Sequence, residues 1–382
     1  MERFDVVVVG GGVIGASIAW RLARLRHRVA LFEPNAMHGA SYAAAGMLAP
    51  VAEAAFGEEA LLALNLAARD AWPGFAADLE QASATSLGFQ QEGTLLIAYD
   101  RGDRDALARV HAYHGELGLP SSWCSPSECR RLEPALAPGV HAGVLIEADG
   151  RVDNRHLLVA LHAAGVAAGV TMIAERVDEV RVDHGRVAGA GAGGHLVDAP
   201  VVVLSTGAER GHIAGLDETL LPPVRPVKGQ IARLRMTSGD PLLTRTVDAI
   251  VEGRHVYLVP RGDGRIVAGA TVEERGSDLT VTAGACADIL RDALSVVPAL
   301  DEAEFVELIA RHRPGTPDNA PIMGPTPLEG LLVATGHYRN GILLAPVTAD
   351  AMTHLIIEGA LPAYAAPFSP ARFVSPLAAS GA

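Results

Sequence analysis

The chain has 382 residues, of which 49% are hydrophobic and 20% are charged. This length suits two domains, and the composition supports large buried cores and excludes an intrinsically disordered protein. The formal net charge of −13 repels the phosphates of nucleic acids and of anionic lipids, so we expect neither nucleic acid nor a membrane as a partner.

The first predicted element is a buried strand of a parallel sheet. Residues 4–9 are rich in valine, which is typical of a strand that is covered on both faces. The motif G-x-G-x-x-G follows at Gly10, Gly12 and Gly15. Residues 16–25 then have the apolar periodicity of a helix. This order of strand, glycines and helix is that of a βαβ fingerprint.

The fingerprint predicts a site for an adenine dinucleotide. Gly10 permits a tight turn, Gly12 lets the backbone approach a pyrophosphate, and Gly15 lets the helix pack closely on the strand. The helix N-terminus offers free N–H groups and the positive end of its dipole to phosphates. A second strand, Val29–Phe32, ends at Glu33, close to the position from which an acid binds the free ribose. The motif does not distinguish NAD from FAD.

Two segments in the middle of the chain could be mistaken for a membrane span and for a second dinucleotide motif. Residues 157–174 contain no charged residue, but Gly165 and Gly169 interrupt them, which favours a helix, a glycine stop and a strand over a membrane span. Residues 189–194 repeat the literal glycine motif, yet no helix follows them. We therefore expect a hairpin turn there, before the strand Val201–Leu204, and only one dinucleotide site.

Candidate substrate residues lie in the C-terminal half of the sequence. The segment Val256–Ala270 contains a Gly-Asp-Gly turn and predicts a β-hairpin. His255 and Tyr257 alternate onto one face of its first strand. Arg311 and Arg313 share a face of another predicted strand, and a guanidinium can bind a carboxylate through two parallel hydrogen bonds.

Three segments carry a resemblance to a known family: residues 44–48 (AAGML), 313–316 (RPGT) and 336–346 (GHYRNGILLAP). Over nearly its whole length the chain resembles the D-amino-acid-oxidase-like family of FAD-dependent oxidoreductases. The resemblance implies an α/β fold, with a Rossmann-like FAD-binding domain and a substrate domain built on a mixed or antiparallel β-sheet. It implies that the FAD-binding domain is discontinuous, at residues 1–50, 148–221 and 311–382, and that the substrate-binding domain comprises residues 51–147 and 222–310.

The resemblance also implies the cofactor and its contacts. FAD would be bound without a covalent link, because the cysteine nearest in sequence to the Arg313 region is Cys286. The contacts would come from the fingerprint, the segment after the second strand, the middle of the chain and the loop before the last helix. The implied cofactor-binding residues are Gly10, Gly12, Val13, Ile14, Gly15, Glu33, Ala40, Ser41, Ala45, Gly46, Met47, Val177, Gly207, His337, Tyr338, Arg339, Asn340, Gly341, Ile342 and Leu343.

Four substrate-binding residues are implied by position. Arg313 would hold the carboxylate, Arg339 would be a second contact, and Tyr257 would present its hydroxyl with His255 as a neighbour. Of these, Arg313, Tyr257 and Arg339 would be the catalytic residues. Arg311 faces the same way as Arg313 and competes with it as the carboxylate anchor.

The implied reaction is the oxidative deamination of glycine or another small amino acid or amine by hydride transfer to flavin N5. Its products would be a 2-oxo acid such as glyoxylate, ammonia and hydrogen peroxide, and the resemblance places this reaction in thiamine thiazole biosynthesis. The alternatives are a D-amino acid dehydrogenase or sarcosine-oxidase-like enzyme of the same fold, and a non-catalytic or tRNA-modifying flavoprotein. We find no candidate carboxylate for a general base, so the substrate is expected to react as the free amine.

The expected partners are a small amino acid or amine and molecular oxygen, in a homo-oligomer without a metal site. The three cysteines, Cys124, Cys129 and Cys286, cannot pair evenly, which favours a reducing cytoplasm. Lys228 is the only lysine beside thirty arginines, and we assign it a structural role.

Overall fold

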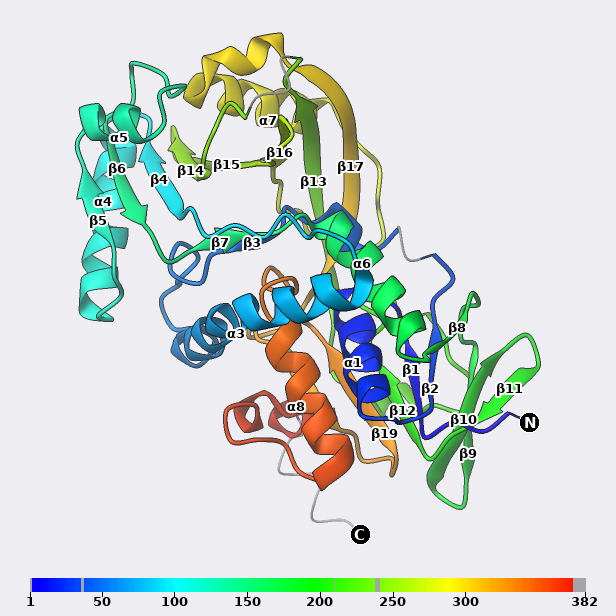
Figure 1. Cartoon of the computed structure of the whole chain (residues 1–382). Helices are drawn as coiled ribbons and strands as arrows, with labels where there is room; N and C mark the ends of the chain where they lie inside the picture. Colours follow the sequence, from blue (N-terminus) through cyan, green and yellow to red (C-terminus); the bar gives the residue numbers. More distant parts are fainter. Residues whose placement is uncertain (1, 36–37, 210, 238–240, 374–382) are drawn as a thin grey trace.

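The computed structural model describes residues 2–35, 38–209, 211–237 and 241–373. It has two halves, each built around one large sheet (Figure 1). One half contains both the blue N-terminal segment and the orange C-terminal segment, so stretches from opposite ends of the chain build it together. The expected fold class is confirmed.

The first half is built on a six-stranded sheet in the order β8-β2-β1-β12-β19-β18. All neighbours are parallel except β18, which runs antiparallel to β19. The central strands are short valine-rich runs that are buried on both faces, as the sequence predicts. The strands are β1 (Val6–Val9), β2 (Val29–Phe32), β8 (Thr171–Ile173), β12 (Val201–Leu204), β18 (Ile322–Pro325) and β19 (Leu331–Thr335).

Helices cover one face of this sheet and a small antiparallel sheet covers the other. Alternate residues of β1 point to the two sides, so Val6 and Val8 join the helical core while Val7 and Val9 join the second core. The helices are α1 (Val13–Arg24), α3 (Glu59–Ser83), α6 (Asn154–Ala167) and α8 (Ala345–Glu358). The small sheet comprises β9 (Glu179–Asp183), β10 (Arg186–Ala192) and β11 (His195–Asp198).

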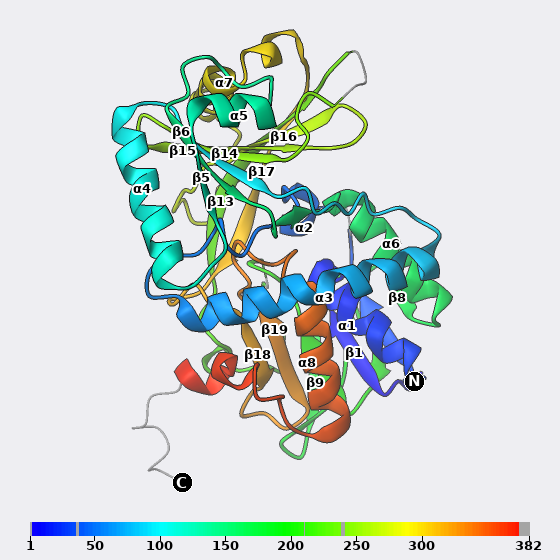
Figure 2. The same cartoon turned by 60° about the vertical axis from the view of Figure 1, so that its left-hand side comes forward.

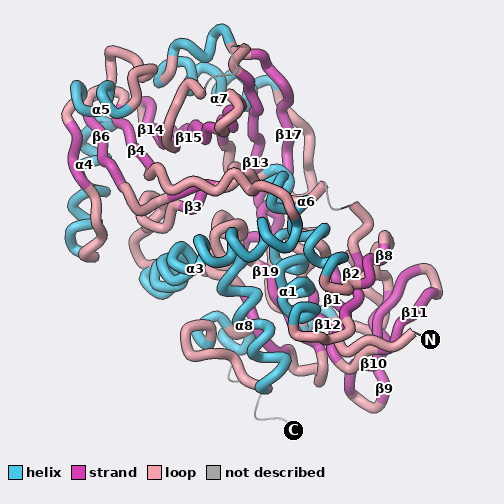
Figure 3. Tube along the Cα trace, viewed as in Figure 1, coloured by secondary structure: helices cyan, strands magenta, loops and turns pink. Residues whose placement is uncertain are grey.

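The second half is an eight-stranded, mostly antiparallel sheet, drawn largely in strand colour in Figure 3. Its order is β17-β13-β16-β15-β14-β4-β6-β5. One face packs on α7, and α4 stands against the other face near the β4 end (Figure 2). The elements are β4 (Thr94–Ala98), α4 (Arg101–Glu116), β5 (Ser122–Cys124), α5 (Pro126–Leu132), β6 (Ala142–Ile146), β13 (Arg225–Arg235), β14 (Thr246–Val251), β15 (Arg254–Pro260), β16 (Arg265–Gly269), α7 (Ala283–Val296) and β17 (Glu304–Gly315).

Short elements join the two halves. Strand β3 pairs with β7, and α2 lies between β2 and β3 in the chain. The bounds of these joining elements are α2 (Ala40–Ala43), β3 (Met47–Leu48) and β7 (Gly150–Arg151).

The packing departs from the expected domain boundaries in two places. Helix α3 lies within residues 51–147, which were expected in the substrate-binding domain, yet it packs on α6 and α8 in the core of the first half. Its Trp72 and Phe75 make an edge-to-face pair there, with ring centroids 5.3 Å apart. Strand β17 continues the large sheet to Gly315, past the boundary expected at residue 310. The end of the range 311–382, from residue 374, lies outside the described residues.

The structures of residues 157–174 and 189–194 agree with the sequence predictions for these two segments. Residues 157–174 form the end of α6, a stop at Gly169 with φ of 97°, and β8. The glycines of residues 189–194 lie in β10 and in its hairpin turn to β11. Among the described residues, every helix is too short or too polar to cross a membrane.

Candidate active site and cofactor cavity

A cavity of about 680 Å³ lies between the two halves of the molecule. It opens at the carboxyl ends of β1, β2, β12 and β19, where open α/β sheets bind their ligands. Its opposite wall comes from the faces of β13 to β17 in the large sheet. One continuous space therefore joins the predicted dinucleotide site to the predicted substrate residues.

The fingerprint forms the turn that the glycine spacing predicts. Gly10 has φ of 98°, and a Cβ at Gly15 would overlap the carbonyl oxygen of Gly10. Gly12 is the N-cap of α1, and the hydroxyl of Ser41 accepts a hydrogen bond of 3.1 Å from the N–H of Val13. The start of α1 therefore faces the cavity with backbone donors and no acidic side chain in its first turn.

Glu33, the acidic residue of the fingerprint, directly follows β2. Its carboxylate accepts hydrogen bonds from the N–H groups of Gly11 at 2.7 Å and Asn35 at 2.8 Å. These two bonds hold the side chain at the wall of the cavity. This placement suits an acid that receives ribose hydroxyls.

The segment after β2 lines the cavity with very small residues. Ala40, Ser41, Ala45, Gly46 and Met47 all belong to its wall. The carbonyl of Ala45 accepts a 2.6 Å hydrogen bond from the guanidinium of the buried Arg261. The carbonyl of Gly46 accepts another from the N–H of Val152 at 2.8 Å. These two hydrogen bonds hold the backbone on the side away from the cavity, so the small residues form a flat surface on the side that faces it.

A buried polar cluster holds that segment to the large sheet. Asp153 accepts an ion pair from Arg265 at 2.9 Å and lies 3.6 Å from Arg261. Burial lowers the pKa of Arg261 to about 9, and it lowers the pKa of Arg233 to about 10. Arg233 donates to the carbonyl of Ala44 at 3.3 Å. Some of the many arginines thus join the two halves behind the cofactor cavity.

The loop before α8 contributes a third part of the wall. His337, Tyr338, Arg339, Gly341 and Ile342 line the cavity. Burial lowers the pKa of His337 to about 3, so this imidazole is neutral, and its Nε2 lies 3.0 Å from the hydroxyl of Thr348.

Three residues expected to bind the cofactor lie outside the wall and support it instead. Gly15 packs under the turn at Gly10. The side-chain amide of Asn340 donates to Glu53 at 2.9 Å, and the carbonyl of Leu343 accepts a 2.8 Å bond from the indole of Trp72. Every other residue expected to bind the cofactor lines the cavity; this set includes Val177 and Gly207.

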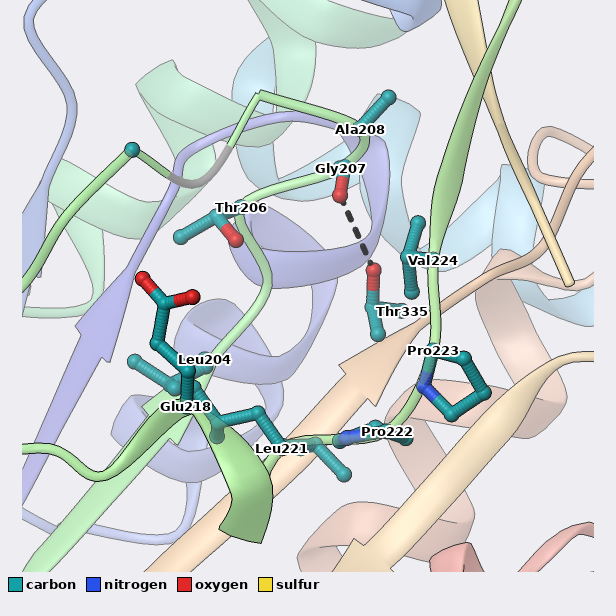
Figure 4. Close-up of a pocket in the computed structure, with 12 residues that line it drawn as sticks. Leu204, Thr206, Gly207, Ala208, Glu218, Leu221, Pro222, Pro223, Val224 and Thr335 are labelled. Atoms are coloured by element: carbon teal, nitrogen blue, oxygen red, sulfur yellow. Dashed lines mark hydrogen bonds between the residues drawn. The ribbon is translucent and has the colours of Figure 1, made fainter. Parts of the chain in front are cut away.

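A smaller cavity of about 330 Å³ adjoins the first at the ends of β12 and β19. Figure 4 shows the hydroxyl of Thr335 donating to the carbonyl of Gly207, at 3.3 Å. Thr206, Gly207, Ala208 and Thr335 line both cavities. The turn after β12, which contains Gly207, is therefore open on two sides.

The substrate end is formed by β15 and β17. Arg313 donates to the carbonyl of Thr271 at 3.0 Å, and its guanidinium lies over Gly229. Burial raises the pKa of Tyr257 to about 12, while the nearby Arg313 opposes this rise. His255 lines the same cavity, and burial lowers its pKa. A hydroxyl and a guanidinium thus face the cavity together.

The other two arginines are held differently. Arg311 donates from Nε to the carbonyl of His38 at 2.6 Å and from Nη1 to the carbonyl of its own neighbour Ala310 at 2.7 Å, so backbone carbonyls hold its guanidinium. Arg339 lies 3.5 Å from the carboxylate of Glu58. Of the three, Arg313 is the guanidinium beside the tyrosine hydroxyl.

Two carboxylates in this cavity were missed by sequence reasoning, which found no candidate acid. Glu53 follows β3, and burial raises its pKa to about 7 although Arg339 lowers it. Asp248 lies in β14, and burial raises its pKa to about 7. The one available signal was the charge of Asp248 within the apolar run TVDAIV. Lys228, in contrast, is buried in an ion pair of 2.9 Å with Asp278, as a structural role requires.

Comparison with known proteins agrees with this geometry. A family model described as FAD dependent oxidoreductase matches residues 5–355. The glycine oxidase of Geobacillus kaustophilus is 36% identical over 98% of this chain and 98% of its own length. The bifunctional protein ThiO/ThiG of a Synechocystis species is 35% identical over 97% of this chain and 54% of its own length. The crystal structure of glycine oxidase from Geobacillus kaustophilus has a TM-score of 0.89 at 35% identity, over 98% of this chain and 100% of that one.

Proposed function

The chain belongs to the FAD-dependent oxidoreductase family, and we propose that it is an amino acid oxidase of the glycine oxidase type. It would convert glycine or another small amino acid or amine to a 2-oxo acid, ammonia and hydrogen peroxide. The observation that carries this proposal is the pairing of Arg313 with Tyr257 at one end of the cavity, whose other end is the dinucleotide fingerprint.

The residues around the cavity fit FAD. Backbone donors at the start of α1 suit a pyrophosphate, and the small residues 43–46 leave room for a flat ring system. None of the three cysteines lines the described cavity, which supports a cofactor held without a covalent bond. When bound, FAD supplies the acceptor for the hydride that leaves the substrate α-carbon.

The residues of the chain bind and orient the substrate. Arg313 would hold the carboxylate through two parallel hydrogen bonds, and Tyr257 would donate its hydroxyl to the same group. Fixing the carboxylate fixes the direction of the α C–H bond, and such positioning supplies much of the rate of a reaction of this kind.

The electrons and protons of the proposed reaction balance as follows. The amine substrate loses a hydride and a proton and becomes an imine, which water converts to the 2-oxo acid and ammonia. Molecular oxygen takes up two electrons and two protons and becomes hydrogen peroxide. The positive end of the α8 dipole would favour negative charge beside the loop of residues 337–343 during this cycle.

The substitution Arg313→Ala tests the carboxylate anchor. We expect the variant to retain its flavin spectrum and to lose reduction by glycine at least 100-fold, because a charge-assisted pair worth about 3 kcal/mol is removed. Anaerobic reduction with glycine, sarcosine, D-alanine and an L-amino acid measures this effect and the substrate range. Unchanged reduction by glycine would move the anchor to Arg311 or Arg339.

Reoxidation in air separates an oxidase from the D-amino acid dehydrogenase alternative. In stopped-flow mixing with oxygen, the reduced flavin of an oxidase returns to its oxidised spectrum, and a flavin that stays reduced for minutes contradicts the proposal. The acidic charge of the chain weighs against a tRNA-modifying flavoprotein. A sarcosine preference in the same assay would indicate the sarcosine-oxidase-like alternative.

We also propose a cytoplasmic homo-oligomer whose product enters thiamine thiazole biosynthesis. The free cysteines Cys124, Cys129 and Cys286 support the reducing compartment. Light scattering of the purified holoenzyme measures the oligomeric state. A monomer at micromolar concentration would contradict that part of the proposal.

A further inference from the structure

Asp248 has no part in the proposed reaction, yet it faces the same cavity. It lies in β14, directly opposite Tyr257 of β15 and opposite Leu96 of β4. Side chains opposite each other on neighbouring strands share a face of the sheet. Asp248 and Tyr257 both line the cavity, so this shared face is the one that meets the substrate.

The carboxylate of Asp248 has no partner among the described residues that would balance its charge. No hydrogen bond or ion pair to it is found in that part of the chain, and Leu96 beside it is a buried apolar residue. Asp248 is half-buried on the cavity wall, and a partly desolvated carboxylate is stabilised when a cation pairs with it. Glu53 differs, because the amide of Asn340 donates to it and Arg339 lies near enough to lower its pKa.

Asp248 is also set apart from the carboxylate anchor. In the large sheet, strands β13, β16 and β15 lie between β17, which carries Arg313, and β14, which carries Asp248. Glycine, with its amine one carbon from its carboxylate, does not extend from Arg313 into a second region of the cavity. A longer substrate would be needed to bring a group to Asp248.

We propose that Asp248 is a specificity-determining residue that binds a distal cationic group, so that the cavity accepts small 2-amino acids with a second ammonium group. The inference rests on the proposed function and names a further substrate class for the same site. The carboxylate end of such a substrate lies at Arg313 and its distal ammonium lies at Asp248. The bonds broken and formed at the α-carbon are those of the reaction above, and the distal ammonium keeps its proton.

The experiment compares three amino acids that differ only at the distal group. Anaerobic flavin reduction of the holoenzyme is measured at pH 8.5 with 2,4-diaminobutyrate, homoserine and norvaline, which present an ammonium, a hydroxyl and a methyl group. We expect kcat/KM for 2,4-diaminobutyrate to exceed that for each neutral isostere at least tenfold. An equal or higher value for norvaline overturns the proposal, as does an equal value for homoserine, which would assign Asp248 to neutral hydrogen bonding.

A variant and a control locate the effect. In Asp248→Asn, which preserves size, the preference for 2,4-diaminobutyrate over norvaline should fall below twofold, and a preserved preference overturns the assignment. Asp288→Asn, on the exposed side of α7 and paired with Arg291, should keep the wild-type preference. The comparison of the three amino acids can be made with the wild-type enzyme alone. The proposal therefore stays testable if Asp248→Asn does not fold.

A binding measurement gives a readout that does not depend on turnover. The acids 4-aminobutyrate and pentanoate lack the α-amine and are not substrates of this oxidation, and they differ only by ammonium against methyl at the far end. Perturbation of the flavin spectrum should give a dissociation constant at least tenfold lower for 4-aminobutyrate in the wild type, and near equality in Asp248→Asn. Equal constants in the wild type contradict the inference, whereas failure of glycine to reduce the flavin contradicts the proposed function alone.

Discussion

Gly229 in β13 lies beneath the guanidinium of Arg313, where a side chain would meet it. An added Cβ would overlap the terminal nitrogens of that arginine, and the arginine side chain is the flexible partner that must move. At the scale of single residues, the missing side chain of one strand thus sets the position of the charged group on the next.

The substitution Gly229→Ala should therefore impair substrate binding while the fold persists. We expect KM for glycine to rise at least tenfold, which corresponds to about 1.4 kcal/mol, with an unchanged flavin spectrum. Steady-state oxygen consumption measures it. The matched control is Gly262→Ala in the hairpin turn, where an added Cβ meets nothing within 4 Å. A wild-type KM in Gly229→Ala would show that Arg313 keeps its function when displaced.

At the scale of residues, the sequence predicted the site residues that are close together in the chain and missed those that are far apart in it. Gly10, Gly12 and Gly15 lie in one turn, so their spacing alone encodes the geometry. Glu53 and Asp248 meet only because a loop after β3 and a strand of the large sheet face one cavity. No spacing rule connects two single acids almost two hundred residues apart.

At the scale of elements, the loop after β3 is held by a buried carboxylate. Asp149 is fully buried and accepts hydrogen bonds from the N–H groups of Val51 at 3.4 Å and Ala52 at 3.2 Å. Burial raises its pKa from 3.8 to about 7, against the lowering by these two bonds. The loop that carries Glu53 therefore depends on a group that titrates near neutrality.

This raised pKa predicts a pH dependence of stability. The folded state binds the Asp149 proton more tightly than the unfolded state, so the contribution is fully present below about pH 4 and is lost as the pH rises to about 7. Its slope is at most about 1.4 kcal/mol per pH unit. Asp149→Asn keeps an acceptor but does not titrate, so the fall in Tm between pH 4.5 and pH 8 should be smaller in this variant.

Thermal unfolding of the holoenzyme across this range tests the assignment. Asp105→Asn, on an exposed position of α4, should keep the wild-type slope. The same slope in Asp149→Asn and in the wild type would mean that other groups account for the pH dependence.

Element boundaries were predictable where a run is buried as a unit. Residues 29–32 and 201–204 form strands at the expected bounds because short, wholly apolar runs of this length fit a strand that is buried on both faces. The sequence could not predict which half of the molecule α3 packs against, since an apolar helix face does not specify which sheet it will cover. The apolar face of α3, including Trp72 and Phe75, packs in the helical core of the first half.

At the scale of the whole molecule, the two halves are joined by buried charges. Arg261, from the turn between β15 and β16 of the large sheet, donates to the carbonyl of Ala45 and lies beside Asp153 at the start of α6. Asp153 also pairs with Arg265, and its own pKa is lowered despite its burial. The interface therefore stabilises the fold and the cofactor wall at once.

The substitution Arg261→Met should lower both the stability of the fold and the affinity for the cofactor. We expect a loss of about 3 kcal/mol in the free energy of unfolding, because one partner of a buried ionic group is removed. We also expect weaker retention of FAD, because Ala45 loses its anchor. Denaturant unfolding and flavin titration measure the two effects. Arg186→Met, which removes an ion pair with Glu329 between two exposed side chains, should cost less than 1 kcal/mol. A loss equally small in Arg261→Met would refute the role of this cluster.

The strand order of the first sheet also sets when the cofactor site can form during synthesis. Strand β1 leaves the ribosome early, but its neighbour β12 begins at Val201, and β19 begins only at Leu331. At about 5–20 residues per second, β19 follows β1 by roughly half a minute. Until β12 arrives, about 10–40 s after β1 at this rate, the edge of β1 that faces it has no partner and is open to chaperones or to aggregation. Flavin capture is thus a late event in the life of each nascent chain.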